Sequence, residues 1–106
     1  MSYEEIFNRL KKTFSKADVS KVKEHYAFQF NIIGEGEGIF YVEIKDGKLY
    51  VEPYEYYDRD AIFIAPAKVF FDIAEGKLNP VQAFSLGKLK VAGNLKKALE
   101  IGNFLK

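Results

Sequence analysis

The stretch of sequence that decides the fold is residues 76–94, GKLNPVQAFSLGKLKVAGN. Gly76 suits the left-handed residue that ends a helix, and Asn79-Pro80 pairs an N-cap residue with proline at the first helical position. Residues 88–91 have the pattern of a short strand, and Asn94 can cap a final helix. The stretch therefore predicts the end of one helix, then a short helix, a strand and another helix.

Helical spacing also marks the beginning of the chain and the segment before Gly76. Ser2 and Glu5 have the spacing of a capping box, which predicts a helix over residues 3–15. Its apolar residues recur every four positions, at Ile6, Leu10 and Phe14. A second apolar stripe, Val69, Phe70 and Ile73, follows Pro66 and predicts the helix that Gly76 ends.

Between these helices the apolar residues alternate with a period of two, which predicts strands. The expected strands are residues 26–33, 40–45, 48–52 and 61–65. Asp46-Gly47 is a preferred pair for a two-residue hairpin turn. Residues 61–65 are apolar on both faces, which indicates a central strand. We therefore expect residues 1–106 to form one α+β domain, with a five-stranded, mostly antiparallel sheet covered by helices.

Composition narrows the class of protein. The chain has 106 residues and no cysteine, so disulfides and cysteine-based chemistry are excluded. Residues 1–5 are acidic and lack an apolar run, so we do not expect a secretory signal there, and we expect a cytoplasmic protein. A net charge of +1 argues against a nucleic-acid partner.

The charges are unevenly distributed along the chain. Residues 9–23 carry six basic side chains and one acidic side chain, whereas residues 35–60 carry eight acidic and three basic side chains. One interpretation is that both segments are ordinary solvated surfaces. The other is that the basic segment contacts anionic lipid headgroups, so that an anionic membrane surface is a transient partner.

The sequence lacks the residue sets that catalysis and metal binding need. His25 is the only histidine, and no serine stands in a nucleophile-elbow motif. The glycine-rich residues 34–38 lack the lysine of a phosphate-binding loop and carry two glutamates. Asp58 and Asp60 alone are weak evidence for a metal site. We expect no catalytic residue, no metal and no cofactor, and treat an enzyme that uses His25 as a minor alternative.

The C-terminal third resembles the sterol carrier protein 2 family. The resemblance is carried by four blocks at matching spacing: residues 76–80, residues 83–84, residues 87–91 and residues 93–94. It implies a five-stranded sheet covered by helices, with a hydrophobic tunnel that binds sterols, fatty acids or fatty acyl-CoA without changing them. Three positions where the family commonly has glutamine are apolar or glycine here, namely Val81, Leu86 and Gly102. Residues 104–106 also differ from the Ser-Lys-Leu peroxisomal signal, so we expect a prokaryotic carrier of a fully apolar ligand.

Strand alternation and helical stripes predict which side chains line this tunnel. They are Phe30, Phe40, Val42, Ile62, Ile64, Phe70, Ile73, Phe84, Leu86, Leu89, Leu99 and Leu105. The C-terminal helix has Leu95, Ala98, Leu99, Gly102 and Leu105 on the face expected to lie over the sheet. Either it is the movable cover of the tunnel, or Gly102 merely allows close packing or marks a frayed end. We therefore predict a non-enzymatic carrier of a fatty acid, a fatty acyl-CoA or a similar lipid. The alternatives are an accessory protein that presents a polyprenyl or quinone intermediate to enzymes, and an interaction domain with a filled core.

Overall fold

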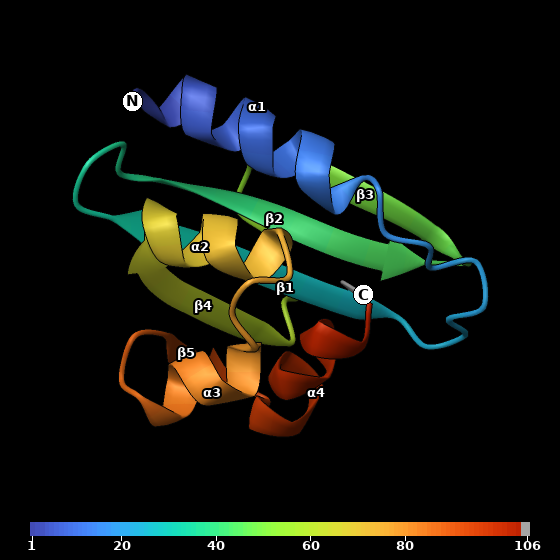
Figure 1. The fold of residues 1–106 in the computed structure, drawn as a ribbon. Coiled ribbons are helices and arrows are strands. Elements are labelled where there is room, and N and C mark those ends of the chain that lie inside the picture. Colours follow the sequence, from blue (N-terminus) through green and yellow to red (C-terminus); the bar gives the residue numbers. More distant parts are fainter. Residues whose placement is uncertain (105–106) are drawn as a thin grey trace.

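A computed structural model describes residues 1–104 as one sheet with helices packed against it (Figure 1). The elements in chain order are α1 Tyr3–Phe14, β1 Tyr26–Ile33, β2 Gly38–Lys45, β3 Lys48–Glu52, β4 Ala61–Pro66, α2 Ala67–Ala74, α3 Pro80–Ser85, β5 Lys90–Gly93, α4 Leu95–Leu99 and the 3-10 turn η1 Glu100–Asn103. This order confirms the α+β class. The fifth strand begins two residues later than the sequence pattern indicates.

The five strands form one mixed sheet in the order β3-β2-β1-β4-β5. The β2–β1, β3–β2 and β5–β4 pairs are antiparallel, whereas β1 and β4 run parallel at the centre. The prediction of a mostly antiparallel sheet is therefore confirmed, with one parallel pair at its middle. In the register, Phe30 lies opposite Phe40 of β2 and Phe63 of β4.

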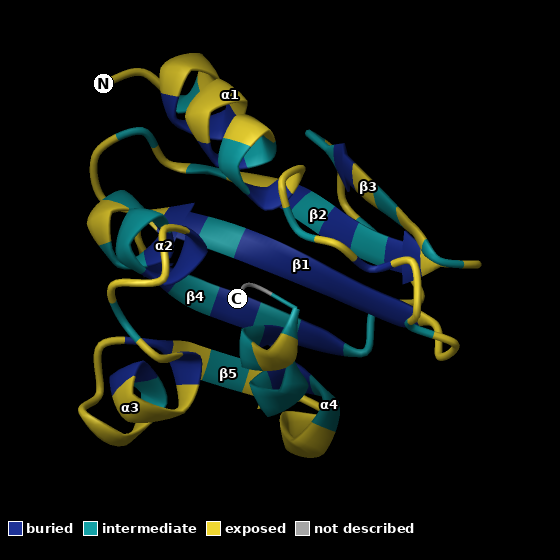
Figure 2. Cartoon of the chain, turned by 45° about the vertical axis from the view of Figure 1, so that its right-hand side comes forward, coloured by how far each residue is buried: buried dark blue, intermediate teal, exposed yellow. Residues whose placement is uncertain are grey.

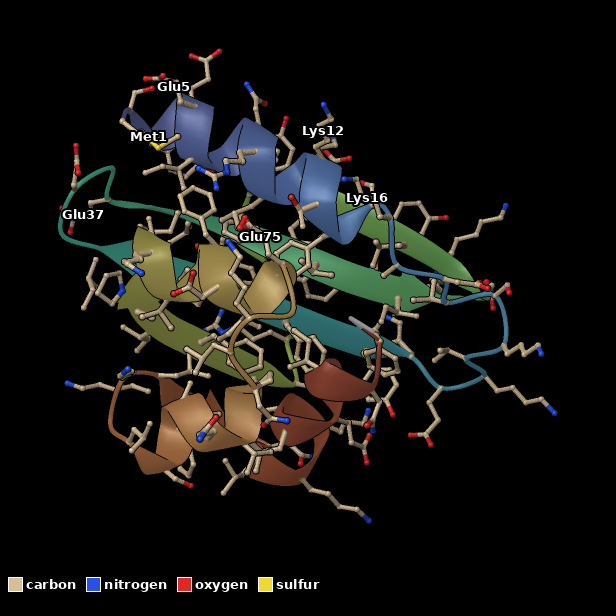
Figure 3. The ribbon with its side chains drawn as sticks, in the orientation of Figure 1. Met1, Glu5, Lys12, Lys16, Glu37 and Glu75 are labelled. Carbon is tan, nitrogen blue, oxygen red and sulfur yellow. The ribbon has the colours of Figure 1, made fainter. Side chains whose placement is uncertain are left out.

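Helices α1, α2 and α4 all lie against the same face of this sheet (Figures 1 and 2). The buried residues gather between that face and the helices, and α1 contributes Ile6, Phe7, Leu10 and Phe14 to them. The opposite side of α1 is charged, and Lys12 and Lys16 extend away from the sheet (Figure 3). The core is thus a single layer between sheet and helices.

The turn and capping residues behave as their chemistry predicts. Ser2 and Glu5 form the complete capping box of α1. Asp46 and Gly47 both have positive φ, 53° and 73°, as the hairpin turn between β2 and β3 requires. The Asn79 side chain accepts hydrogen bonds from the first N–H groups of α3, and Asn94 does the same for α4. None of the helices described within residues 1–104 is long and apolar enough to cross a membrane.

Candidate functional site

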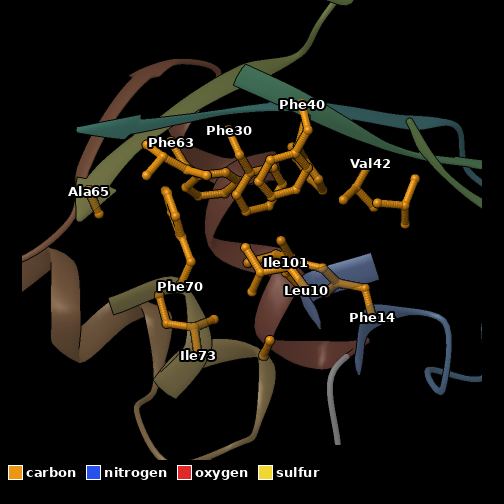
Figure 4. Close-up of a cluster of buried hydrophobic side chains, with 14 of the residues drawn as sticks. Leu10, Phe14, Phe30, Phe40, Val42, Phe63, Ala65, Phe70, Ile73 and Ile101 are labelled. Carbon is orange, nitrogen blue, oxygen red and sulfur yellow. The ribbon is translucent and has the colours of Figure 1, made fainter. Parts of the chain in front are cut away.

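Phenylalanine side chains form the floor of the space between the sheet and the helices (Figure 4). Phe30 of β1 is at their centre, stacked on Phe40 with ring centroids 4.8 Å apart. Its ring also lies 5.0 Å from that of Phe63 and 5.2 Å from that of Phe70 on α2. Such offset and edge-to-face pairs add about 0.5–1.5 kcal/mol each beyond simple burial. The sheet and α2 are therefore joined through one aromatic cluster.

A small cavity lies beside Phe30, where α2, α3, β5 and η1 meet over the sheet. Its lining residues are Phe30, Phe63, Phe70, Ile73, Pro80, Leu89 and Ile101. Its volume is only about 10 Å³, close to what one water molecule occupies. This cavity is therefore far smaller than the expected tunnel. Large apolar side chains from several elements surround it closely, and an open void in a core would cost about 24 cal/mol per Å³.

The lining of this cavity offers nothing to which a polar ligand group could bond. Every side chain around it is aliphatic or aromatic. Among residues 1–104, Gln29 is the one buried polar side chain, and it belongs to the opposite face of the sheet, where it bonds to Asn31. Since burying an unpaired polar group is costly, a molecule that entered this space would have to be apolar there.

Half of the predicted lining residues are buried in this core, namely Phe30, Phe40, Val42, Phe70, Ile73 and Leu89. Phe30, Phe70, Ile73 and Leu89 border the cavity itself. Phe84 and Leu99 are half-buried. Leu105 lies outside the described residues.

The inward orientation predicted for three other residues is wrong. In β4 the buried positions are Ala61, Phe63 and Ala65, so Ile62 and Ile64 lie on the opposite face of the sheet. The strand is apolar at every position, and its pattern therefore does not reveal which set faces the core. Leu86 follows the last residue of α3 and is 60% exposed, because the helix ends before its turn would bring that side chain inward.

Sequence reasoning missed three lining residues, Phe63, Pro80 and Ile101. The strand register explains why Phe63 lines the cavity, because Phe63 pairs with Phe30 across the parallel strands. A sequence signal for it exists: Ala61 and Ala65 flank Phe63 on the same face and leave space for helices to pack closely. Pro80 fits the first position of a helix, and its ring is also a compact apolar surface that can line a cavity.

The C-terminal cover presents to the sheet a face that agrees with the prediction at Ala98 and differs from it at Leu95 and Ile101. Ala98 and Ile101 are buried, whereas Leu95 is 42% exposed. α4 ends at Leu99 and the chain continues as the tighter turn η1, which rotates Ile101 relative to its place in an ideal α-helix.

Polar contacts hold this cover to β1. Tyr26 donates a hydrogen bond from its hydroxyl to Glu100, and burial together with this bond raises the pKa of the Tyr26 phenol. The Lys97 ammonium donates to the His25 carbonyl at 3.1 Å and to Asp60 at 3.3 Å, and lies 5.4 Å from the Tyr26 ring centre. We call Tyr26, Asp60, Lys97 and Glu100 the clamp.

Asp60 has a structural role at the junction of β1, β4 and α4. Its carboxylate accepts the Ala27 N–H at 2.9 Å, and its carbonyl accepts the Asn94 N–H at 2.8 Å. No cluster of three or more potential metal ligands occurs within residues 1–104. The contacts of Asp60 therefore account for its position at this junction.

His25 belongs to a small polar network on the other face of the sheet. Its Nε2 lies 2.7 Å from Glu43, which also accepts a hydrogen bond from the Tyr56 hydroxyl at 2.6 Å. Burial alone would raise the pKa of Glu43, but the hydrogen bonds from His25 and Tyr56 outweigh it, and the pKa is lowered. The hydrogen bond to Glu43, followed by burial, raises the pKa of Tyr56 to about 12.

The comparisons with known proteins agree with this fold. Residues 7–106 match the model of the SCP-2 sterol transfer family. The chain belongs to that family. The resemblance seen in the sequence is thereby confirmed over nearly the whole chain.

Relatives and solved structures place this SCP-2 chain in context. It is 32% identical over 101 residues to hydroxysteroid dehydrogenase-like protein 2 of Bos taurus, which covers 92% of this chain and 23% of that protein. The chain thus spans about a quarter of that relative. The solution structure of palmitated SCP2L2 from Aedes aegypti matches with a TM-score of 0.69 at 21% identity, over 99% of this chain and 95% of that one. UbiJ-SCP2, a ubiquinone synthesis protein, matches with a TM-score of 0.60 at 15% identity, over 92% and 74% of the two chains. At such identities these two structures show the shared fold alone.

Proposed function

We propose that this SCP-2 chain is a cytoplasmic, non-enzymatic lipid carrier, with residues 1–106 forming one lipid-binding domain. Its ligand is a fatty acid, a fatty acyl-CoA or a similar molecule whose apolar chain inserts between the sheet and the helices. The observation that carries the proposal is the cavity beside Phe30, whose lining is entirely apolar. Family membership supports the same role.

The elements above the cavity are suited to moving apart. α3, α4 and η1 have six, five and four residues, and each is too short to be stable without packing. α4 and η1 are anchored by two buried side chains, Ala98 and Ile101, together with the clamp. Opening at this side therefore disrupts few contacts of the aromatic cluster on the sheet.

The energetics favour a closed empty form and an expanded loaded form. A void of about 300 Å³, the lower end for ligand pockets, would cost about 7 kcal/mol if it stayed empty. An acyl chain of about 14 methylenes gains roughly 11 kcal/mol on leaving water, before the ordering costs of binding. A lipid that supplies its own volume can therefore hold open a space that the protein alone keeps closed.

A second candidate function is the presentation of a polyprenyl or quinone lipid intermediate to biosynthetic enzymes. It is favoured by the fold shared with the ubiquinone synthesis protein UbiJ-SCP2. The apolar cavity lining serves this function equally well, because both ligand types bring an aliphatic chain. The two candidates differ in the ligand and in the enzyme that receives it.

Native mass spectrometry of the purified chain tests the proposal. After incubation with palmitic acid we expect one lipid per chain, and competition with a short-chain ubiquinone analogue ranks the two candidate ligands. Ile73→Asp, which places a charge at the cavity, should abolish the adduct, whereas Ile64→Asp on the opposite face should retain it. Circular dichroism establishes that both variants are folded. The absence of any adduct with either lipid would refute the carrier role.

A further inference from the structure

A groove of about 320 Å³ lies at the end of the sheet where β4 finishes and β5 begins (Figure 1), and we call it the β4–β5 groove. Ile33 and Pro66, the paired last residues of β1 and β4, border it. So does Ile64, which pairs with Lys90 of β5. No residue that lines this groove also lines the cavity beside Phe30. Ligand pockets begin at roughly 300 Å³, so the groove has room for a small molecule outside the candidate lipid compartment.

The floor of the β4–β5 groove consists of apolar side chains that the fold leaves partly uncovered. Ile33 is 44% exposed, and Ile64 and Val69 are half-buried. Ile64 lies on the face of β4 opposite the aromatic cluster, whereas Val69 belongs to α2. A hydrocarbon group that covered these side chains would remove apolar surface from water, which favours binding.

Two lysines line the same groove, and no acidic side chain does. Lys88 and Lys90 are both exposed, whereas Leu89 between them is buried and lines the cavity beside Phe30. Among residues 1–104, no carboxylate lies within 4 Å of either lysine ammonium group. The groove therefore combines an apolar floor with two positive charges that no described acidic residue neutralises.

A larger groove, of about 510 Å³, lies between α1, the loop after β1 and the start of α2, but its charges are already paired. Arg9 and Lys68, which line it, each lie 3.2 Å from a carboxylate oxygen. Glu35, another lining residue, lies 2.7 Å from the amino group of Met1. An anion would have to displace these carboxylates. The two lysines of the β4–β5 groove are therefore the better anion site, although the groove is smaller.

We propose that the β4–β5 groove binds a small phosphate monoester with a compact hydrocarbon body. The phosphate group lies between Lys88 and Lys90, and the hydrocarbon body covers the apolar floor. A monoester carries a charge of about −1.5 to −2 at neutral pH and three acceptor oxygens, so it matches two ammonium groups better than a carboxylate does. Inorganic phosphate would use the lysines alone. The proposal is independent of the lipid-carrier function, because the two sites have separate linings.

Titration of the full ¹⁵N-labelled chain with phenyl phosphate, followed by NMR, tests the site. The amide signals of Ile64, Val69 and Lys90 should shift, and the affinity should be about tenfold or more above those of inorganic phosphate and of phenol. K88Q/K90Q should weaken binding about tenfold or more, because each lysine provides a charge-assisted hydrogen bond. Ile64→Ser should weaken it about fivefold without changing net charge, because part of the apolar floor is lost.

The matched control is K12Q/K16Q, which removes the same charge at two exposed positions in and after α1. It should change the affinity for phenyl phosphate by no more than about twofold, because the charges it removes are distant and screened by salt. The proposal is overturned if the groove signals do not shift, if both double variants lose affinity equally, or if inorganic phosphate binds as tightly as phenyl phosphate.

A second readout separates this site from the lipid compartment. Signal shifts confined to Phe30, Phe70 and Ile101 would place phenyl phosphate in the cavity and would also overturn the proposal. Palmitate binding should be the same in K88Q/K90Q as in the unchanged chain, because neither lysine lines that cavity. Failure of the unchanged chain to bind palmitate would refute the carrier function alone, since phenyl phosphate binding does not depend on it.

Discussion

At the scale of single residues, the two faces of β4 decide which side chains belong to the core. Phe63 pairs with Phe30 and contacts the cavity, whereas Ile62 lies on the opposite face beside Ala92 of β5. Phe63→Ala should destabilise the fold by about 3–5 kcal/mol, while Ile62→Ala should cost about 1 kcal/mol. Urea denaturation of the two variants measures both values. A larger loss for Ile62→Ala than for Phe63→Ala would mean that the strand has the orientation first predicted from sequence.

The polar network around Glu43 makes stability depend on pH. Because the pKa of Glu43 is lower in the folded chain, its ionised form stabilises the fold above the unfolded pKa of about 4.3. That contribution is lost as pH falls through the folded value. Glu43→Gln should therefore be less stable than the unchanged chain at about pH 6, and the difference should shrink towards about pH 3. Urea midpoints measured across this pH range test whether the stability difference has the expected sign, and Glu37→Gln at an exposed position is the control.

Residue patterns predicted capping and turns well because these depend on local chemistry. Ser2, Asp46-Gly47, Asn79 and Asn94 each act within a few residues of their own position. The choice between Ile62 and Phe63 depends instead on the pairing of β4 with β1, far away in sequence. Because β4 is apolar at almost every position, its own sequence does not indicate that pairing.

At the scale of elements, the C-terminal cover departs most from its prediction. The apolar spacing of residues 95–105 is compatible with one continuous helix, but the chain tightens into η1 from Glu100. The clamp accounts for this arrangement, since Lys97 and Glu100 both contact Tyr26 from consecutive turns. Sequence reasoning did not assign these polar partners, because each joins residues more than 70 positions apart.

The cover can be loosened or stiffened by single substitutions. Tyr26→Phe removes the hydrogen bond to Glu100 and should increase hydrogen exchange in residues 95–103, because the cover then opens more often. Gly102→Ala should slow it, since the added Cβ would lie 3.4 Å from the Pro80 ring, an ordinary contact, and alanine restricts the unfolded chain. Exchange in α1 serves as the internal reference. Identical exchange in both variants would show that the clamp does not hold the cover closed.

At the scale of the whole molecule, resemblance and local pattern predicted different parts of the structure. Helix and strand order followed from periodicity, and the family resemblance implied the same five-stranded sheet covered by helices. The small size of the cavity beside Phe30 followed from neither, because it depends on how Phe30, Phe70 and Ile101 fill one volume from three separate elements. Packing of this kind is a property of the assembled core and leaves no periodic signal in the sequence.

The small size of the cavity beside Phe30 has a kinetic consequence for the proposed carrier. Its volume of about 10 Å³ is too small for an acyl chain, so a chain that enters at this point requires the cover to open first. When opening precedes binding and is slow, the observed binding rate stops rising as ligand concentration increases. Stopped-flow measurements with a fluorescent fatty acid should therefore reach a plateau, and that plateau equals the opening rate. Tyr26→Phe should raise it by weakening the clamp, and Gly102→Ala should lower it, while equilibrium affinity changes much less. A rate that stays proportional to ligand concentration and is the same in both variants would show that lipid enters without opening this cover.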